Sequence, residues 1–236
     1  RHYPGRVAPH SSPSGGSDNS GHSNRLVRRL HHRRFGNYER LVPTSLTKPT
    51  PKSPLPHQFV NLPAGIKRPP YADSGQVPSD SFVPEIPILT ADEIARLRRA
   101  SKLAKEALEF GGSLVKVGAT TAEIDERIYE FITQDKGAYP SPLNYSGYPR
   151  SVCTSINNVI CHGIPDNRRL VCGDIINIDV TVYKDGFHGD TSYTYLVGEV
   201  DEKGRELTQA TKEALELGIC VCGPGVPFKE IGRVIE

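Results

Sequence analysis

The sequence predicts an α+β domain over residues 89–236, preceded by a long segment without regular periodicity. Three observations carry this prediction. Two helix-start signals, each followed by apolar residues at helical spacing, come first. Three strand-like runs follow them, and helical spacing then returns toward residue 236. Helices, then strands, then a helix in one continuous run are typical of an α+β domain.

The first helix is expected to begin at Thr90, because Thr90-Ala-Asp-Glu93 is a capping box whose two ends satisfy each other's backbone amides. The helix should end at Gly111-Gly112, and its apolar residues recur at helical spacing: Ile94, Leu97, Leu103, Ala104, Ala107 and Leu108. A short strand is predicted over 113–117. Thr120-Thr-Ala-Glu123 is a second capping box and predicts another helix, which Gly137 ends.

Strands are predicted over residues 151–156, 175–183 and 188–197, where β-branched and aromatic residues are frequent. Asp185-Gly186 lies between the last two runs and is a preferred two-residue hairpin turn. Helical spacing returns over 206–220, and Pro227 is expected to start a further helix.

The predicted hairpin brings two carboxylates together. If Asp185 and Gly186 form the loop, Asp179 lies opposite Ser192, and Asp190 shares the face of Asp179 as a diagonal neighbour. Two like charges on one sheet face repel each other unless a positive charge lies between them. A pair of divalent cations would supply it, because bridging carboxylates suit such ions. The residues alone also allow two ordinary solvated strand carboxylates.

Other polar residues near the hairpin have more than one interpretation. His162 follows a strand in Cys161-His-Gly-Ile-Pro165 and could be functional or structural. His188 shares the face of Asp190 by alternation, so it could bind a metal, support a ligand or lie exposed. Asp174 and Asp185 are expected to form turns. The aromatic segment 139–149 could line a small apolar pocket or pack as a lid.

The N-terminal segment differs in composition from the predicted domain. Residues 1–70 contain 12 basic and 2 acidic residues, whereas the rest of the chain contains 17 and 25. Residues 1–40, rich in Arg and Ser and poor in acids, are typical of an organelle-targeting leader. A disordered basic tail and a nucleic-acid-binding arm are the alternatives, although aromatic residues for base stacking are sparse. Residues 41–88 are rich in proline and are expected to form an extended linker lying on a neighbouring part.

Composition argues against several classes of protein. No run approaches 18 consecutive apolar residues, so no membrane span is expected. No apolar core follows the N-terminal basic residues, which argues against a secretory signal. The five cysteines form no CxxC pair and are odd in number, so a zinc ribbon and a disulfide framework are not expected. A reducing cellular compartment fits this number and spacing of cysteines better.

Four segments taken together resemble the type 1 methionine aminopeptidases: Tyr139–Pro149, Ser151-Val-Cys-Thr-Ser-Ile-Asn157, Cys161–Pro165 and Ile175–Ser192. The likeness covers about residues 90–236 in order and with similar spacing. The proline-rich residues before it resemble the organellar members, especially the mitochondrial form. The cytosolic members carry instead a Cys-rich zinc-finger extension, and this sequence shows none.

The resemblance implies the pita-bread fold, in which two related α/β halves enclose a site for two divalent metal ions (Co, Mn, Fe or Zn). It implies that Asp179 and Asp190 bind metal, and that His162 contacts the scissile amide and assists proton transfer. It further implies that Tyr145, Tyr148 and Cys153 line the pocket for the methionine side chain. One further wall position varies among family members, and in this sequence it is occupied by Pro142.

In one respect the chain departs from the family pattern. The resemblance implies three more metal ligands, a histidine and two glutamates, in the second half of the fold. The chain ends at Glu236, in what resembles the first helix of that half, and Glu230 and Glu236 do not fall in the ligand motifs. We therefore expect the N-terminal half of the fold to be essentially complete and the C-terminal half to be largely missing.

The expected function is removal of the initiator methionine from nascent polypeptides, whose N-termini would be the substrates. We expect no nucleic-acid partner and a monomer, located in the mitochondrion or alternatively in a plastid. Two other functions remain possible: a catalytically silent pita-bread fragment that binds a partner, and a relative of the prolidases. The aromatic loop and the Cys-His-Gly-Ile-Pro segment argue against the prolidases. The 236-residue chain alone is expected to have little or no activity.

Overall fold

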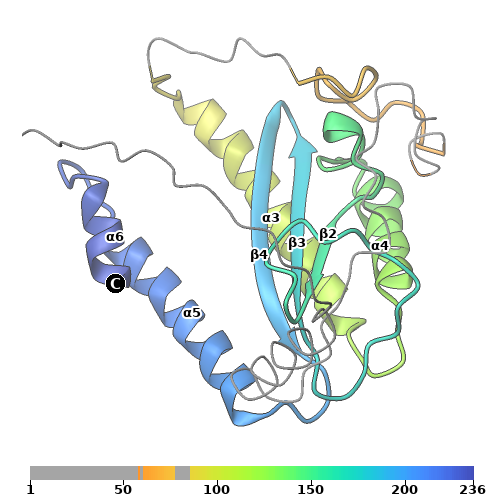
Figure 1. Cartoon of the computed structure of the whole chain (residues 1–236). Coiled ribbons are helices and arrows are strands. Elements are labelled where there is room, and N and C mark those ends of the chain that lie inside the picture. Colours follow the sequence, from red (N-terminus) through yellow and green to blue (C-terminus); the bar gives the residue numbers. More distant parts are fainter. Residues whose placement is uncertain (1–57, 59–60, 78–85) are drawn as a thin grey trace, which may run out of the picture. The chain divides into compact units, whose positions relative to one another are not determined.

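The computed structural model describes residues 58, 61–77 and 86–236. The predicted targeting leader (residues 1–40) and much of the predicted linker lie outside these described residues. The chain forms these elements in order: α3 (Ala91–Ser113), α4 (Thr121–Glu130), the π-helical turn η1 (Phe131–Asp135), β1 (Tyr139–Pro140), the 3-10 turn η2 (Tyr145–Gly147), β2 (Cys153–Ile156), β3 (Ile175–Lys184), β4 (Phe187–Leu196), α5 (Glu202–Val221) and α6 (Lys229–Ile235) (Figure 1).

Both predicted capping boxes are present. The Thr90 hydroxyl accepts from the Glu93 amide at 3.3 Å, and the Glu93 carboxylate accepts from the Thr90 amide at 2.8 Å. Thr120 and Glu123 form the same reciprocal pair at 3.1 and 2.9 Å. Because each pair satisfies backbone amides that a helix start leaves without partners, α3 and α4 begin where the sequence predicts.

β3 is the central strand of a four-stranded antiparallel sheet. One edge of β3 pairs with β4, and the other edge pairs with β1 and β2 (Figure 1). Asp185 and Gly186 connect β3 to β4 with φ values of 55° and 91°. Positive φ at both residues is the geometry of a type I′ hairpin, which matches the twist of the strands. The predicted register is confirmed, because Asp179 lies opposite Ser192.

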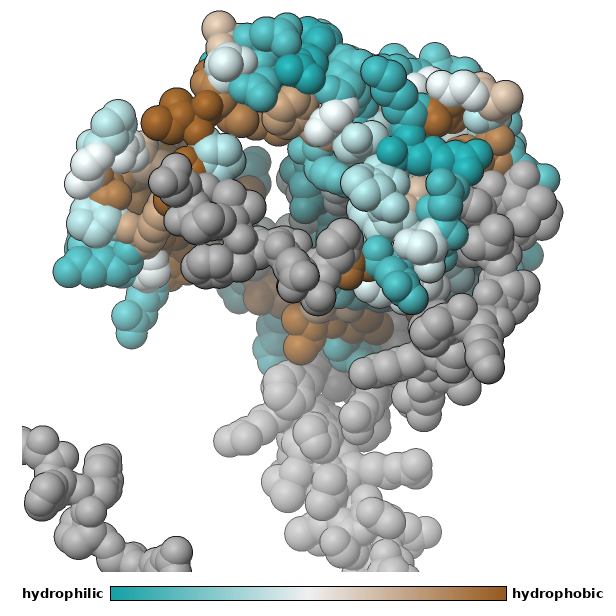
Figure 2. Space-filling model, turned by 90° about the horizontal axis from the view of Figure 1, so that it is seen from above, coloured by the Kyte–Doolittle hydropathy of each residue, from teal (hydrophilic) through white to brown (hydrophobic). Residues whose placement is uncertain are grey.

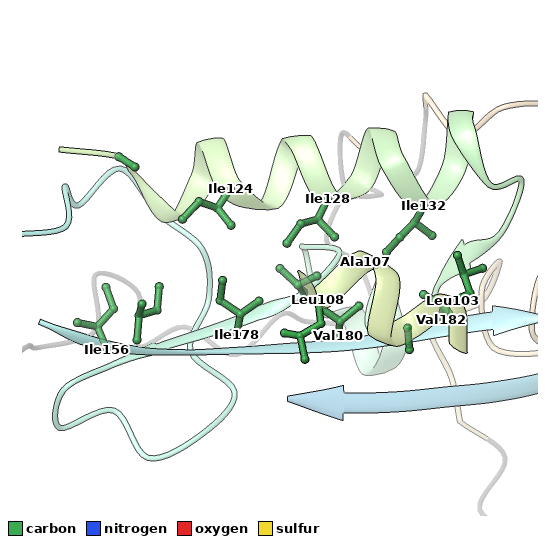
Figure 3. Close-up of a cluster of buried hydrophobic side chains, with 14 of the residues drawn as sticks. Leu103, Ala107, Leu108, Ile124, Ile128, Ile132, Ile156, Ile178, Val180 and Val182 are labelled. Atoms are coloured by element: carbon green, nitrogen blue, oxygen red, sulfur yellow. The ribbon is translucent and has the colours of Figure 1, made fainter. Parts of the chain in front are cut away.

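α3 and α4 cover one face of this sheet. This face carries the even-numbered residues of β3, which are Ile176, Ile178, Val180 and Val182. They share a buried cluster with side chains of the helices (Figure 3): Leu103, Ala107 and Leu108 from α3, Ile124 and Ile128 from α4, and Ile132 from η1. Because side chains alternate along a strand, the odd-numbered residues of β3 point to the opposite face. The candidate site lies on that opposite face.

The prediction of a strand over residues 113–117 is wrong. α3 continues to Ser113, and the amides of Leu114 and Val115 turn back to the carbonyls of Gly111 and Gly112 at 3.1 Å each. Leu114 and Val115 pack against the core as partly buried residues. Leu114 and Val115 therefore complete the C-terminal end of α3 and do not form a strand.

Residues 61–77 form turns without a helix or strand, and they pack on the domain. Leu62, Tyr71 and Ala72 share a second buried cluster with Tyr139 and Leu143. Asn144 fixes this segment by donating its side-chain amide to the Ala72 carbonyl at 2.7 Å. Residues 61–77 thus supply buried side chains to the folded part of the chain.

α5 and α6 contact each other and expose many apolar side chains. These include Leu207, Leu215, Ile219, Phe228 and Ile235. Hydrophobic surface, coloured brown, lies open beside hydrophilic surface in the space-filling view (Figure 2). Across the described part of the chain, no helix combines the length and the apolar character that crossing a membrane would need.

Candidate active site

The register of the sheet places the two predicted metal ligands beside each other. Asp179 on β3 lies between Cys153 on β2 and Ser192 on β4, while Asp190 pairs with Thr181 two residues further along β3. The Thr181 hydroxyl donates to the Asp190 carboxylate at 2.8 Å. Asp179 and Asp190 therefore share the sheet face opposite the hydrophobic core, as the hairpin geometry predicted.

The two carboxyl groups perturb each other. The pKa of Asp179 is raised to about 6, first by desolvation and then by the negative charge of Asp190 and a hydrogen bond with it, while nearby His162 opposes the shift. Like charges at close range favour protonation of one partner unless a cation offsets them. The donor set, the half-buried carboxylate of Asp179 beside the exposed carboxylate of Asp190, therefore fits a divalent metal ion.

His162 lies beside this pair in a constrained turn. Its φ is 54°, in the left-handed region that non-glycine residues seldom adopt. The following residue, Gly163, bonds to β2: its carbonyl accepts from the Thr154 amide at 2.9 Å, and its amide donates to Ser155 at 3.2 Å. A side chain at Gly163 would collide with the Thr154 backbone. This close approach sets the His162 ring at the edge of the sheet.

An open pocket of about 680 Å³ contains all the sequence-predicted site residues. It is lined by Asp179, Asp190, His162, Tyr145, Tyr148 and Cys153, together with Pro142, Tyr71, Ser141, Ser146, Ile164, Thr181 and His188. The aromatic segment 139–149, which the sequence interpreted as a pocket wall or a lid, contributes side chains to the wall. The pocket thus combines a polar floor on the sheet with aromatic walls.

Tyr148 and Cys153 form one wall. The Tyr148 hydroxyl donates to the carbonyls of Val152 and Gly163, each at 3.0 Å, which joins the aromatic loop to the turn that holds His162. Burial raises the pKa of the Cys153 thiol to about 11, and burial also raises the pKa of Tyr148 well above its ordinary value. Both groups are neutral at physiological pH, so this wall suits an apolar side chain.

His188 lies at the other end of the pocket. Its Nδ1 atom is 2.8 Å from the Ser141 hydroxyl, and its ring contacts the rings of Tyr71 and Tyr183. Desolvation on its packed side lowers the pKa of His188, while Asp190 opposes the shift. His188 is exposed, which is one of the interpretations that the sequence left open, and its contacts place it on the pocket wall.

Asp174 and Asp185 lie in turns, as predicted, and both lie outside the pocket. Asp174 is buried and pairs with Arg168 at 2.8 Å, and it accepts from the Asn157 side chain at 2.8 Å. Asp185 forms the hairpin turn and pairs with Arg99 at 3.1 Å. Neither carboxylate lines the pocket.

Sequence reasoning missed Tyr71 and Thr181 as pocket residues. Thr181 could have been found by alternation, because it lies two residues after Asp179 on the same strand. No local signal points to Tyr71, which lies in a proline-rich segment 108 residues before Asp179. Its place in the pocket depends on tertiary contacts alone.

Comparison with known proteins identifies the family. The sequence profile of Metallopeptidase family M24 matches residues 95–236, more than half of the chain. The chain belongs to metallopeptidase family M24. Members of this family are metal-dependent peptidases, in keeping with the carboxylate pair and the raised pKa of Asp179.

The M24 chain is similar to methionine aminopeptidases from organelles. It is 53% identical over 175 residues to "Methionine aminopeptidase 1B, chloroplastic" of Arabidopsis thaliana, covering 74% of this chain and 47% of the relative. It is 49% identical to "Methionine aminopeptidase 1D, mitochondrial" of Danio rerio, covering 74% of this chain and 51% of the relative. The resemblance noted in the sequence is therefore confirmed. The chain spans about half the length of the curated relatives it matches.

A crystal structure of methionine aminopeptidase from Rickettsia prowazekii shares the fold with a TM-score of 0.62 at 47% identity. The match covers 64% of this M24 chain and 60% of that chain. The expected α+β pita-bread fold class is confirmed by this likeness together with the family match.

The part of the chain that the structure describes contains no group of three or more His, Cys, Asp or Glu residues arranged to hold a metal ion. Glu230 lies in α6 and pairs with Arg233 at 2.6 Å, so its carboxylate is engaged locally. Within the described residues, Asp179 and Asp190 are therefore not part of a larger group of such side chains arranged to hold a metal ion.

Proposed function

We propose that this protein is a metalloaminopeptidase that removes the initiator methionine from nascent polypeptides. The observation that carries the proposal is the Asp179–Asp190 pair beside His162, on the floor of a pocket whose wall contains Tyr145, Tyr148 and Cys153. The printed names of the relatives, methionine aminopeptidases at 49–53% identity, support the same substrate class.

In this proposal Asp179 and Asp190 hold two divalent metal ions. Such ions, when bound, supply Lewis-acid activation of water and of the scissile carbonyl. His162 lies at the edge of the carboxylate pair and donates a hydrogen bond to the scissile amide, which assists proton transfer. Thr181 fixes one carboxylate oxygen of Asp190 through its hydroxyl and so sets the orientation of that ligand.

The pocket wall accounts for a preference for methionine. Cys153 and Tyr148 are neutral, and their hydrogen-bonding groups are directed at the backbone or buried. A flexible thioether side chain fits an apolar slot lined by aromatic rings and sulfur. A charged or strongly polar first residue would lose its hydration on entering this slot without gaining a partner.

The central test is hydrolysis of a Met-Ala-Ser peptide, with added Co²⁺ or Mn²⁺, by the full-length protein, meaning the whole gene product with any residues that precede or follow these 236. Asp179→Asn removes the charge without changing the shape of the side chain, and we expect a loss of kcat/KM of about 10²-fold or more. Asp185→Asn is the matched control, because it makes the same change in the same hairpin but outside the pocket. Equal activity in the two variants would refute the proposed role of the carboxylate pair.

The number and identity of the ions form a second measurable part of the proposal. Titration calorimetry of the full-length protein with Mn²⁺, Co²⁺, Fe²⁺ and Zn²⁺ should give two sites per chain, and Asp179→Asn should remove tight binding. A stoichiometry of one, or binding unaffected by this substitution, would contradict the two-ion proposal.

We also propose that the protein acts in an organelle, the mitochondrion first and a plastid as the alternative. Residues 1–40 are basic and poor in acidic residues, and several relatives carry mitochondrial or chloroplastic names. Residues 1–40 fused to a fluorescent protein should direct it to an organelle. A diffuse signal in the cytosol would argue against this proposal.

A further inference from the structure

The segment before the helical domain reaches the pocket through Tyr71. Tyr71 is one of the residues that line the pocket around Asp179 and Asp190. Its ring meets the ring of Tyr145 edge-on, with centroids 5.0 Å apart, and stacks on His188 with centroids 6.2 Å apart. Tyr71 therefore joins two parts of the pocket wall that come from different elements.

Tyr71 is held rigidly in this position. Its side chain is 7% exposed, and its hydroxyl donates to the Ser141 carbonyl at 2.7 Å. The next residue is fixed as well, because the Ala72 carbonyl accepts from Asn144 at 2.7 Å. A buried tyrosine whose hydroxyl has a partner presents an apolar ring with few conformations to lose on binding. Such a ring is suited to contact an apolar ligand.

The register of the sheet locates Tyr71 relative to the carboxylate pair. Cys153 pairs with Asp179, so the wall of Cys153 and Tyr148 lies at one end of the pair. The Ser141 amide bonds the Thr181 carbonyl at 2.8 Å, and Thr181 pairs with Asp190, so Ser141 lies toward the other end. Tyr71 bonds Ser141 and stacks on His188, and it therefore closes the Asp190 end of the pocket.

We propose that Tyr71 is a specificity-determining residue, whose ring contacts the apolar side chain of the bound peptide together with Tyr145. This inference rests on the proposed aminopeptidase function for its substrate class. It makes the proline-rich segment around residues 61–77 a part of the binding site. A substrate side chain would then be enclosed by groups from two distant parts of the sequence.

The test uses the full-length protein, Met-Ala-Ser peptide and steady-state kinetics. Tyr71→Ala removes the ring, and we expect KM to rise about tenfold while kcat stays within about twofold, because the contact is made equally before and during reaction. Tyr71→Phe keeps the ring and should recover most of that loss. Asp73→Ala is the control, because it removes an exposed ion pair with Arg68 from the same segment without touching the pocket.

Several outcomes would overturn the proposal. An unaltered KM in Tyr71→Ala would do so, as would an equal rise in Asp73→Ala, which would indicate general loosening of the segment. An equal loss in Tyr71→Phe would assign the effect to the hydroxyl and not to the ring. If Tyr71→Ala does not fold by circular dichroism, Tyr71→Leu replaces it, since leucine keeps much of the buried volume but not the aromatic contact.

A binding measurement separates this inference from the proposed function. L-methionine is titrated into the full-length protein, and isothermal titration calorimetry measures its binding. If the protein cleaves no methionyl peptide but Tyr71→Ala weakens L-methionine binding, the proposed function fails and the role of Tyr71 stands. If cleavage occurs and binding by Tyr71→Ala matches the parent protein, the role of Tyr71 fails alone.

Discussion

Asp125 shows at the scale of one residue how the pocket wall is held. Its side chain is completely buried in α4 and accepts from the amides of Ser151 and Val152 at 2.8 and 3.2 Å. It also accepts from the Gln58 side chain at 2.7 Å and lies 3.5 Å from Arg150. These contacts fix the residues directly before Cys153 and join them to the N-terminal segment.

We expect Asp125→Ala to lower the free energy of unfolding by about 2–4 kcal/mol, because two buried backbone amides lose their acceptor. Urea denaturation of the full-length protein measures this change. Asp92→Ala is the control, since Asp92 is exposed in the first turn of α3 and pairs with Arg96. A loss no larger than that of the control would contradict the expected role of Asp125.

The pH dependence of stability gives a second test at Asp125. Burial raises its pKa to about 6, although the surrounding donors and Arg150 oppose the shift. An unfolded aspartate titrates near pH 4, so the folded protein binds the proton more tightly. The contribution of protonated Asp125 to the free energy of unfolding is therefore fully present below about pH 4 and is lost as pH rises through about 6.

Asp125→Asn should remove this contribution. The parent protein is expected to lose up to about 3 kcal/mol more stability than the Asn variant between pH 4 and 7. Other titrating groups are common to both proteins, so the difference between the two denaturation series isolates Asp125. Parallel curves for the two proteins would show that its pKa is not raised.

At the scale of elements, the packing of α3 on β4 depends on Gly189. A β-carbon at Gly189 would lie 2.3 Å from the backbone carbonyl of Ala100 in α3. Ala100 and Gly189 are both buried, so neither element can shift without disturbing the core. The absence of a side chain at Gly189 permits this close contact between helix and sheet, and the hairpin that carries Asp190 depends on it.

Gly189→Ala is expected to destabilise the protein by about 2–3 kcal/mol, because the helix must move away from the sheet. Thermal unfolding followed by circular dichroism measures the change. Gly232→Ala in α6 is the matched control: apart from its chain neighbours and its own helix backbone, no atom lies within 4 Å of the added β-carbon, and alanine is a better helix former. Comparable melting temperatures for the two variants would refute the close contact as a constraint.

At the scale of the whole molecule, the exposed apolar surface of α5 and α6 affects how strongly the 236-residue chain associates or aggregates when it is made alone. Leu207, Leu215 and Ile219 of α5 are about 60% exposed, and Phe228 beside α6 is 86% exposed. Exposed apolar groups on neighbouring helices favour association or coverage by another surface. The curated relatives are about twice as long as the part of them that this chain matches.

We therefore expect the 236-residue chain made alone to bind Mn²⁺ or Co²⁺ weakly and to have little aminopeptidase activity. Two carboxylates leave an ion mostly hydrated and poorly oriented. Calorimetry, a Met-Ala peptide assay and light scattering for aggregation measure these properties. Turnover comparable to that of a full-length relative, abolished by Asp179→Ala, would contradict the expectation while supporting the site.

The sequence by itself determined the elements that short-range physics controls. The capping boxes at Thr90 and Thr120, the Asp185-Gly186 turn and the face shared by Asp179 and Asp190 all depend on residues close together in the chain. Each signal reflects a local backbone requirement, so it can be read without knowing the rest of the fold. The resemblance to methionine aminopeptidases rests on the same segments.

Tertiary structure alone decided which distant residues complete the site. Tyr71 bonds Ser141 across 70 residues, and Gln58 bonds Asp125 across 67. The residues after Gly112 turn back onto α3 because the core accepts their side chains there, although their apolar character suits a strand equally well. Contacts of this kind depend on the burial that the assembled fold offers, and no local pattern in the chain encodes that burial.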